Sequence, residues 1–263
     1  MPTSPARITV SLLGPVTAAT GGGGLAICGE RQRRLLASLA LSLGEVVPVE
    51  RLVKDIWGDE PPRTASGQLQ TAMWRLRRAL EPADADRTAF VTYPAGYQLD
   101  RSACTSDVAE FRTKAAEAKE LHREGLREPA VERWEEALAL WRGPALADVS
   151  GSALRARATR LEEERLAALE QRISLEVELG RHARVIGELS DLVAQHPFRE
   201  SLHAELMLAL YQAGRQAEAL AAFRRVRALL DQELGISPGA RLVELERAIL
   251  RQDRALLPAP ASC

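Results

Sequence analysis

The stretch from Arg63 to Leu80, RTASGQLQTAMWRLRRAL, most constrains what this chain can fold into. Its apolar residues recur at helical spacing, so they form one stripe along a helix and leave a polar face opposite. The stripe consists of Leu69, Met73, Leu76 and Leu80, with Ala65 and Ala72 beside it. The stretch contains no acidic residue, although the whole chain has a formal net charge of −1. The pattern predicts a helix with a carboxylate-free face, which can approach a phosphate backbone without repulsion.

The polar face carries side chains that can recognise DNA. Arg75 and Arg78 are candidates for bidentate contact with guanine or for contact with phosphate. Gln68 and Gln70 are candidates for contact with adenine, and Thr71 can bond a base edge or touch a thymine methyl group. The alternative is an ordinary solvated helix face.

Three further residues of this helix have expected roles of their own. Gly67 lets the backbone approach DNA closely because it has no side chain. Trp74 lies about 140° around the helix from Leu69, so we expect it to face outward and to meet thymine methyl groups or a sugar edge. The alternative is that Trp74 packs on a neighbouring hairpin or domain. Arg77 lies nearer the apolar stripe, which favours a phosphate contact.

The residues around this helix predict a winged helix-turn-helix, in which the third helix enters the major groove and a hairpin wing reaches the minor groove or the backbone. Periodicity and turn residues define the expected elements. They are a β-hairpin region at residues 7–28 (strand Arg7 to Val16, turn Gly21 to Gly24, return Leu25 to Cys28), helices at Arg31 to Leu43, Val49 to Trp57 and Arg63 to Leu80, and a terminal hairpin at Phe90 to Leu99.

Phosphate contacts are expected from the end of the second helix, the start of the third helix and the wing. The candidates are Trp57 through its indole N–H, Arg63, Ser66, Thr92 and Tyr97. For Trp57 the alternative is simple core packing.

Composition limits the class of protein further. The 263 residues are enough for two domains, and the aromatic content of 4% favours helices rich in leucine and alanine. The near-neutral charge excludes a globally basic nucleic-acid binder, so any DNA site must be a local patch. No stretch approaches the roughly 18 apolar residues of a membrane span, and the apolar run Ile8 to Leu13 is too short for a secretory signal. We therefore expect no membrane partner.

Three glycines reveal an internal repeat in the second half of the chain. Gly125, Gly180 and Gly214 are each followed at the same spacing by apolar residues. These are Ala130, Val185 and Ala219 five residues on, Trp134, Leu189 and Phe223 nine on, and Ala137, Leu192 and Val226 twelve on. Gly180 and Gly214 lie 34 residues apart, which is the tetratricopeptide period. The pattern predicts stacked helical hairpins without strands, and a generic helical bundle is the alternative.

Several motifs resemble those of a known family. The segments LLGPV at 12–16, RQRRLLASLAL at 31–41, VPVERLVKDIWGDEPP at 47–62, LQTAMWRLRRAL at 69–80 and YPAGYQL at 93–99 resemble OmpR-type winged helices. The segments LALWRGPALADV at 138–149, RLEEERLAALEQRI at 160–173 and ELGISPGARLVELERAIL at 233–250 resemble the bacterial transcriptional activator domain. Together they are similar to the SARP family of antibiotic regulatory proteins.

The resemblance implies a fold that is mainly α with a small β component. We expect a winged-helix DNA-binding domain at 7–100, an all-α tetratricopeptide-like domain at 101–253, and a disordered tail at 254–263. It also implies a transcriptional activator of secondary-metabolite genes, which binds tandem direct repeats of double-stranded promoter DNA near the −35 element and associates with itself there. In the OmpR type the loop at Asp59 and Glu60 meets RNA polymerase, which makes the holoenzyme, through its sigma factor and other subunits, an expected partner. The alternative for this loop is a plain connector.

The sequence shows no catalytic site. Its histidines, His122, His182, His196 and His203, form no metal-binding pair, and no phosphate-binding or dinucleotide-binding motif is present. Cys28, Cys104 and Cys263 lack metal or disulfide spacing, which indicates a reducing cytoplasm. We therefore expect a non-enzyme without metal or cofactor, located in the cytoplasm with the nucleoid. A tetratricopeptide-type interaction scaffold and a ligand-gated repressor, with an effector pocket between the domains, remain the alternatives.

Overall fold

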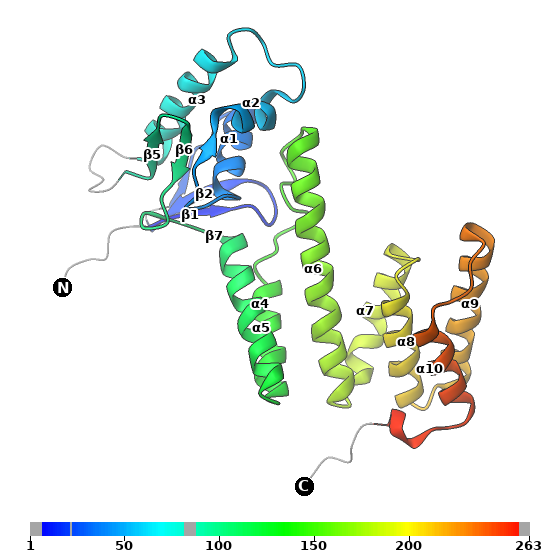
Figure 1. The fold of residues 1–263 in the computed structure, drawn as a ribbon. Helices are drawn as coiled ribbons and strands as arrows, with labels where there is room; N and C mark the ends of the chain where they lie inside the picture. The colour runs from blue at the N-terminus through cyan, green and yellow to red at the C-terminus, as the bar shows by residue number, and fades with distance from the viewer. Residues whose placement is uncertain (1–6, 22, 82–87, 258–263) are drawn as a thin grey trace, which may run out of the picture. The chain divides into compact units, whose positions relative to one another are not determined.

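The computed structural model describes residues 7–21, 23–81 and 88–257 (Figure 1). The chain forms two compact units. The first comprises Met1–Glu117 with Glu135–Leu166, and the second comprises Ala118–Trp134 with Ala167–Cys263. The expected fold class, mainly helical with a small β portion at the N-terminal end, is confirmed. The expected boundary near residue 100 differs from these units, because residues 101–117 and 135–166 belong to the first of them.

The first sheet corrects two expectations. It contains β1 (Ile8–Ser11), β2 (Thr17–Thr20), β3 (Gly23–Leu25) and β7 (Cys104–Ser106) in the order β3-β2-β1-β7. The expected strand to Val16 ends at Ser11, because the backbone N–H groups of Leu12 and Leu13 donate to the Asp107 carboxylate at 2.8 and 3.0 Å. The expectation of no strand after residue 100 is wrong as well, since β7 pairs in parallel with β1.

The winged helix follows the expected order closely. Its elements are α1 (Glu30–Ala40), β4 (Val47–Pro48), α2 (Val49–Trp57), α3 (Ala65–Leu80), β5 (Phe90–Tyr93) and β6 (Gly96–Leu99). Strands β4, β6 and β5 form a second sheet in that order. The three helices bury one apolar cluster, whose largest members are Leu35, Leu36, Leu39, Leu52, Ile56, Leu69, Met73 and Leu76. Most of the expected loop between α3 and β5 falls in residues 82–87, outside the described residues.

Residues 142–148 bind the N-terminal part of the chain through its backbone. The N–H groups of Arg142 and Leu146 donate to the carbonyl groups of Leu13 and Leu12 at 2.7 and 3.0 Å. The Asp148 carboxylate accepts from the Val16 N–H at 2.7 Å and pairs with Arg33 of α1 at 3.0 Å. These bonds satisfy backbone groups of Leu12, Leu13 and Val16, which follow β1 and lie beside the core. The segment is therefore part of the first unit and not a linker that follows it.

A buried polar cluster joins α6 (Ser152–Glu178) to α1 and α2 within the first unit. Asp55 of α2 is 5% exposed, and its carboxylate accepts from the Ser38 hydroxyl at 2.5 Å. The Arg157 guanidinium lies 3.6 Å from the same carboxylate and donates to the Ser42 hydroxyl at 3.0 Å. A buried carboxylate is costly unless it is hydrogen-bonded and paired, so Arg157 stabilises the seating of α2.

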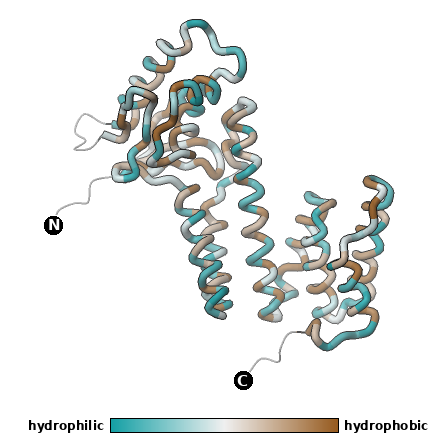
Figure 2. Tube along the Cα trace, in the orientation of Figure 1, coloured by the Kyte–Doolittle hydropathy of each residue, from teal (hydrophilic) through white to brown (hydrophobic). Residues whose placement is uncertain are grey.

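The remaining helices form consecutive hairpins. They are α4 (Asp107–Arg123), α5 (Arg127–Leu138), α6, α7 (His182–Gln195), α8 (Glu200–Gln212), α9 (Gln216–Leu234) and α10 (Ala240–Leu250). Along the tube in Figure 2 each of these helices carries both hydrophobic and hydrophilic residues. This matches helices that bury one face against their neighbours.

The three repeat glycines occupy the same place in three hairpins. Gly125, Gly180 and Gly214 have φ of 81°, 72° and 76°, and each follows a helix end. In every case the glycine N–H bonds the carbonyl three residues back, and the next N–H bonds the carbonyl five residues back. This is the Schellman arrangement, which requires a left-handed residue. All nine apolar positions of the repeat are buried, as expected: Ala130, Trp134, Ala137, Val185, Leu189, Leu192, Ala219, Phe223 and Val226.

The C-terminal segment is partly ordered. A short 3₁₀ helix spans Arg254–Leu256, and the Leu256 carbonyl accepts from the Gln212 side chain at 2.9 Å. The expected disordered tail from residue 254 is therefore wrong for residues 254–257. Residues 258–263 lie outside the described residues.

The Arg157 cluster generates a stability prediction. Arg157→Met is expected to lower the free energy of unfolding by about 2–3 kcal/mol, because it leaves the Asp55 carboxylate buried without its cation. Arg160→Met is the matched control, since the Arg160 side chain is 82% exposed and pairs with Glu164 at 3.6 Å. It should cost less than about 1 kcal/mol. Urea denaturation of the whole chain measures both, and equal costs would contradict the role of Arg157.

Substitution of a repeat glycine and of a glycine inside a helix is predicted to change stability in opposite directions. Gly180→Ala forces a Cβ into a left-handed conformation and is expected to cost about 1–2 kcal/mol. Gly187 lies inside α7, and a Cβ there would meet nothing within 4 Å. Gly187→Ala should therefore stabilise the protein by about 0.5–1 kcal/mol. Thermal melting of the two variants distinguishes their signs; a shift in the same direction would refute the assignment of Gly180 as a helix terminator.

Candidate nucleic-acid interface

Helix α3 has the two faces that its sequence predicts. Ala65, Leu69, Met73, Leu76 and Leu80 are buried on its inner face. The candidate contact residues Ser66, Gln70, Thr71, Trp74, Arg75 and Arg78 are exposed on the other, while Gln68 and Arg77 are half-buried. Arg63, just before the helix, is also exposed. The outer face therefore presents hydroxyl, amide and guanidinium groups and no carboxylate.

The first turns of α3 are held by their own side chains. The Gln68 amide donates to the Thr64 hydroxyl at 2.9 Å, and its oxygen accepts from Arg31 of α1 at 3.5 Å. The Thr71 hydroxyl donates to the Gly67 carbonyl at 3.1 Å. Gln68 is thus engaged within the protein, whereas Gln70 extends from the helix without a hydrogen bond recorded among the described residues.

Trp74 faces outward, as the helical geometry predicts. It is 58% exposed, so more than half of its surface is open to solvent. The Arg78 guanidinium lies over its ring at 5.6 Å from the ring centroid. A cation stacked on an indole is a pre-oriented pair, because the ring limits where the guanidinium can go. Trp74 and Arg78 therefore form one recognition feature on the outer face of α3.

The wing is attached to α3 by a hydrogen bond. Arg77 donates to the Thr92 hydroxyl at 2.6 Å, and Thr92 lies opposite Tyr97 in the β5–β6 ladder. Tyr93 donates from its hydroxyl to Gln98 at 2.8 Å, and Gln98 donates to the Gly44 carbonyl at 2.7 Å. The structure thus brings Arg77, Thr92 and Tyr97 together. It gives Arg77 a positioning contact that sequence reasoning did not foresee.

The end of α2 and the following loop differ in exposure. The Trp57 indole nitrogen is enclosed and has no partner among the described residues. Its expected contact with a phosphate therefore requires access to a group that is covered here. The loop beyond it is exposed: the Asp59 side chain is 80% exposed and lies 3.7 Å from Lys54, and Glu60 is exposed too.

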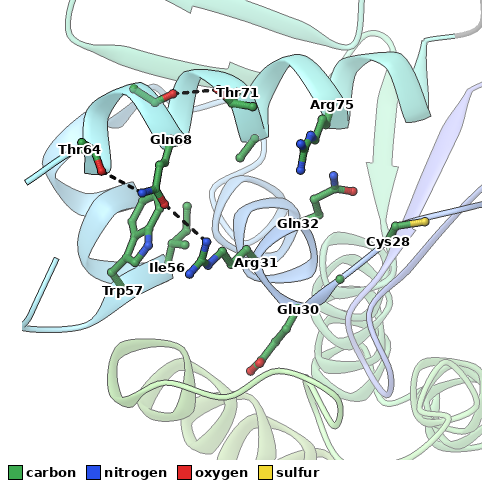
Figure 3. Close-up of a pocket in the computed structure, with 13 residues that line it drawn as sticks. Cys28, Glu30, Arg31, Gln32, Ile56, Trp57, Thr64, Gln68, Thr71 and Arg75 are labelled. Atoms are coloured by element: carbon green, nitrogen blue, oxygen red, sulfur yellow. Dashed lines mark hydrogen bonds between the residues drawn. The ribbon is translucent and has the colours of Figure 1, made fainter. Parts of the chain in front are cut away.

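A cleft of about 850 Å³ adjoins the outer face of α3 (Figure 3). Its walls come from the start of α1 with the two residues before it, from the end of α2, and from the segment between Thr64 and Arg75 at the start of α3. It is lined by Cys28, Gly29, Glu30, Arg31, Gln32, Ile56, Trp57, Thr64, Gly67, Gln68, Thr71, Ala72 and Arg75. The place of Gln32 in the α1 wall was not foreseen from sequence, and the available signal was the polar run Glu30-Arg31-Gln32 directly after Gly29.

Glu30 is the acidic residue among those that line the cleft, and its carboxylate points away (Figure 3). It accepts from the Ser150 hydroxyl and pairs with Arg34 at 2.9 Å. The hydrogen bond from Ser150, with those from Arg34, lowers the pKa of the Glu30 carboxyl to about 2. Glu30 therefore stays ionised, and its charge is balanced by Arg34 outside the cleft.

Among the described residues, no three His, Cys, Asp or Glu side chains lie together in a way that could hold a metal ion. No helix in the described part of the chain is both long and apolar enough to cross a bilayer. Cys104 is buried, and burial raises the pKa of its thiol to about 12, whereas Cys28 is exposed.

Comparison with known proteins gives two family matches. The bacterial transcriptional activator domain matches residues 106–250, which is more than half of the chain. The family described as transcriptional regulatory protein, C terminal, matches residues 26–99, from α1 to the wing.

Relatives match across the whole chain. Regulatory protein DnrI of Streptomyces peucetius is 39% identical, over 96% of this chain and 98% of its own length. Regulatory protein AfsR of Streptomyces griseus is 38% identical over 97% of this chain, which corresponds to 26% of that longer protein. The solved structure of Mycobacterium tuberculosis EmbR in complex with low affinity phosphopeptide is 33% identical with a TM-score of 0.89, over 97% of this chain and 67% of EmbR.

The wing generates a prediction with a matched control. A Cβ at Gly96 would overlap the Val47 carbonyl oxygen of β4, whereas a Cβ at Gly67 of α3 would meet nothing within 4 Å. Gly96→Ala is expected to cost about 2 kcal/mol or more, because the β4–β6 backbone pairing has to shift. Gly67→Ala should be neutral or stabilising by up to about 1 kcal/mol. Denaturant titration measures both variants; a neutral Gly96→Ala would contradict this geometry of the wing.

Proposed function

The chain belongs to the SARP family of transcriptional regulators, and from this premise we propose that it activates a secondary-metabolite pathway by binding tandem direct repeats near a promoter −35 element. The observation that carries the proposal is the exposed, carboxylate-free face of α3 with the wing hydrogen-bonded beside it. Such a face suits the major groove, and the wing suits the adjoining groove or backbone. The relatives that span the chain are regulatory proteins, which agrees with this role.

Base reading and backbone contact fall to different residues in the proposed complex. Gln70, Thr71 and the stacked pair Trp74–Arg78 are exposed on the outer face of α3, so we assign them to base edges and thymine methyl groups. The remaining candidates lie around them and contact the sugar-phosphate backbone or position α3. They are Trp57, Arg63, Ser66, Gln68, Arg75, Arg77, Thr92 and Tyr97.

The acidic loop after α2 is the proposed contact with RNA polymerase. Asp59 and Glu60 are exposed, and the following Pro61-Pro62 limits the conformations of the loop. Two exposed carboxylates beside the DNA-binding helix suit a basic surface of the holoenzyme, such as that of a sigma factor. Other polymerase subunits are further candidates.

Tandem direct repeats require neighbours that contact head to tail. Sites about one helical turn apart place two copies on the same face of the DNA. Because a direct repeat relates its copies by translation, their contact is heterologous and joins two different surfaces of the chain. We infer self-association on DNA from this requirement. We assign the chain no catalytic activity and no cofactor, and a cytoplasmic location with the nucleoid.

Footprinting on promoters from the neighbourhood of the gene tests the proposal. The wild type, Thr71→Ala/Arg78→Ala and Arg160→Ala are compared at two salt concentrations. The wild type should protect a pair of direct repeats, and less so at high salt. The double variant should bind about 10- to 100-fold more weakly, since a bidentate base contact is worth about 1–3 kcal/mol. Arg160→Ala, which removes an 82% exposed arginine of α6, should match the wild type.

Three outcomes would contradict parts of this proposal. A folded protein that protects no promoter at either salt concentration favours the interaction scaffold or a required effector. Protection of the repeats with reduced output from a promoter fusion favours a repressor. Equal binding by the wild type and Thr71→Ala/Arg78→Ala would contradict the assigned reading face.

A further inference from the structure

The cleft beside α3 has an unbalanced positive charge. Two of its lining residues, Arg31 and Arg75, form no ion pair among the described residues. Some other arginines of the same unit are ion-paired, as Arg33 is with Asp148 at 3.0 Å and Arg112 is with Glu164 at 2.8 Å. The Glu30 carboxylate is turned away and is balanced by Arg34. Two unpaired cations facing one cleft indicate an anionic occupant.

The cleft also offers hydrogen-bond donors. In Figure 3 the Arg75 guanidinium and the Gln32 amide point toward the same part of the cavity from opposite walls. The oxygens of a phosphodiester accept hydrogen bonds and donate none, so they complement these two donor side chains.

The position of the cleft suits the backbone of a continuous DNA strand better than a free anion. Its volume of about 850 Å³ is far larger than one phosphate group needs. Gly67 and Thr71 belong both to its wall and to the outer face of α3. A Cβ at Gly67 would meet nothing within 4 Å, so no neighbouring group closes the wall there. A DNA strand whose bases face α3 can therefore pass its backbone through this cleft.

We propose that the cleft between α1 and α3 seats the sugar-phosphate backbone of one DNA strand, with Arg31 of α1 and Arg75 of α3 as a two-sided phosphate clamp and Gln32 as an additional donor. The inference rests on the proposed DNA binding and makes it more specific. It adds Arg31 and Gln32 to the interface. It also narrows the role of Arg75 from backbone contact or positioning to a phosphate contact, and leaves base reading to Gln70, Thr71, Trp74 and Arg78.

Salt dependence separates a phosphate clamp from a base reader. Arg31→Ala, Arg75→Ala and Arg78→Ala are titrated with the specific duplex and with a scrambled duplex over a range of salt concentrations. Each lost phosphate contact should reduce the slope of log affinity against log salt by about 0.9. Arg31→Ala and Arg75→Ala should therefore weaken both duplexes alike and keep the ratio of their affinities within about twofold. Arg78→Ala is the contrasting variant and should reduce that ratio about tenfold.

The opposite pattern would overturn the proposal. If Arg75→Ala lowers the specificity ratio and leaves the salt slope unchanged, Arg75 reads a base. If Arg31→Ala changes neither quantity, the backbone does not enter the cleft. A wild type that binds neither duplex would instead count against DNA binding itself, so the two failures are distinguishable. Thermal melting of each variant checks that it is folded.

Cys28 provides an independent probe of the cleft. Cys28 is exposed and stands at the edge of the cleft, whereas Cys104 is buried. In a Cys263→Ser variant, N-ethylmaleimide should therefore label Cys28 selectively. Saturating specific duplex should slow this labelling at least tenfold. Unchanged labelling in a bound complex would contradict occupation of the cleft, even if the arginine variants weaken binding.

Discussion

The arrangement of the DNA-binding unit depends on one buried carboxylate, that of Asp55. It is 5% exposed and lies between the Ser38 hydroxyl of α1 and the Arg157 guanidinium of α6. An unpaired carboxylate in that position would be costly, so the cluster favours the arrangement in which α1, α2 and α6 pack together. Helix α2 ends at Trp57 and leads through the acidic loop into α3. The position of α3 therefore depends on Arg157, which lies about 100 residues after Asp55 in the chain.

This dependence changes how the two sequence domains are understood. The family matches end at residue 99 and resume at residue 106, as though two modules were joined there. In the structure the first compact unit extends through residues 135–166 of the activator domain. Residues 142–148 supply hydrogen bonds to Leu12, Leu13 and Val16, and β7 completes the first sheet. The winged helix and the start of the activator domain therefore belong to one compact unit.

A slightly acidic chain can present a basic surface because of where its ion pairs lie. Acidic residues balance arginines on the helices away from the proposed interface, as Arg112 and Glu164 do. On α3 and in the adjoining cleft the cations have no such partners among the described residues, and the Arg78 guanidinium stacks on Trp74 instead. Local charge, and not net charge, determines what this surface can bind.

The sequence by itself determined the features that depend on local spacing. The apolar stripe of α3, the outward position of Trp74 and the three glycine-terminated hairpins all follow from helical period and from the left-handed preference of glycine. Only the tertiary structure decided the parallel pairing of β7 with β1 and the salt bridge of Arg157 with Asp55. It also decided that Arg31 and Arg75 line the same cleft. These features join residues that are far apart in sequence. Such contacts leave no periodic signal in the sequence, because the packing of whole helices and strands determines which residues become neighbours.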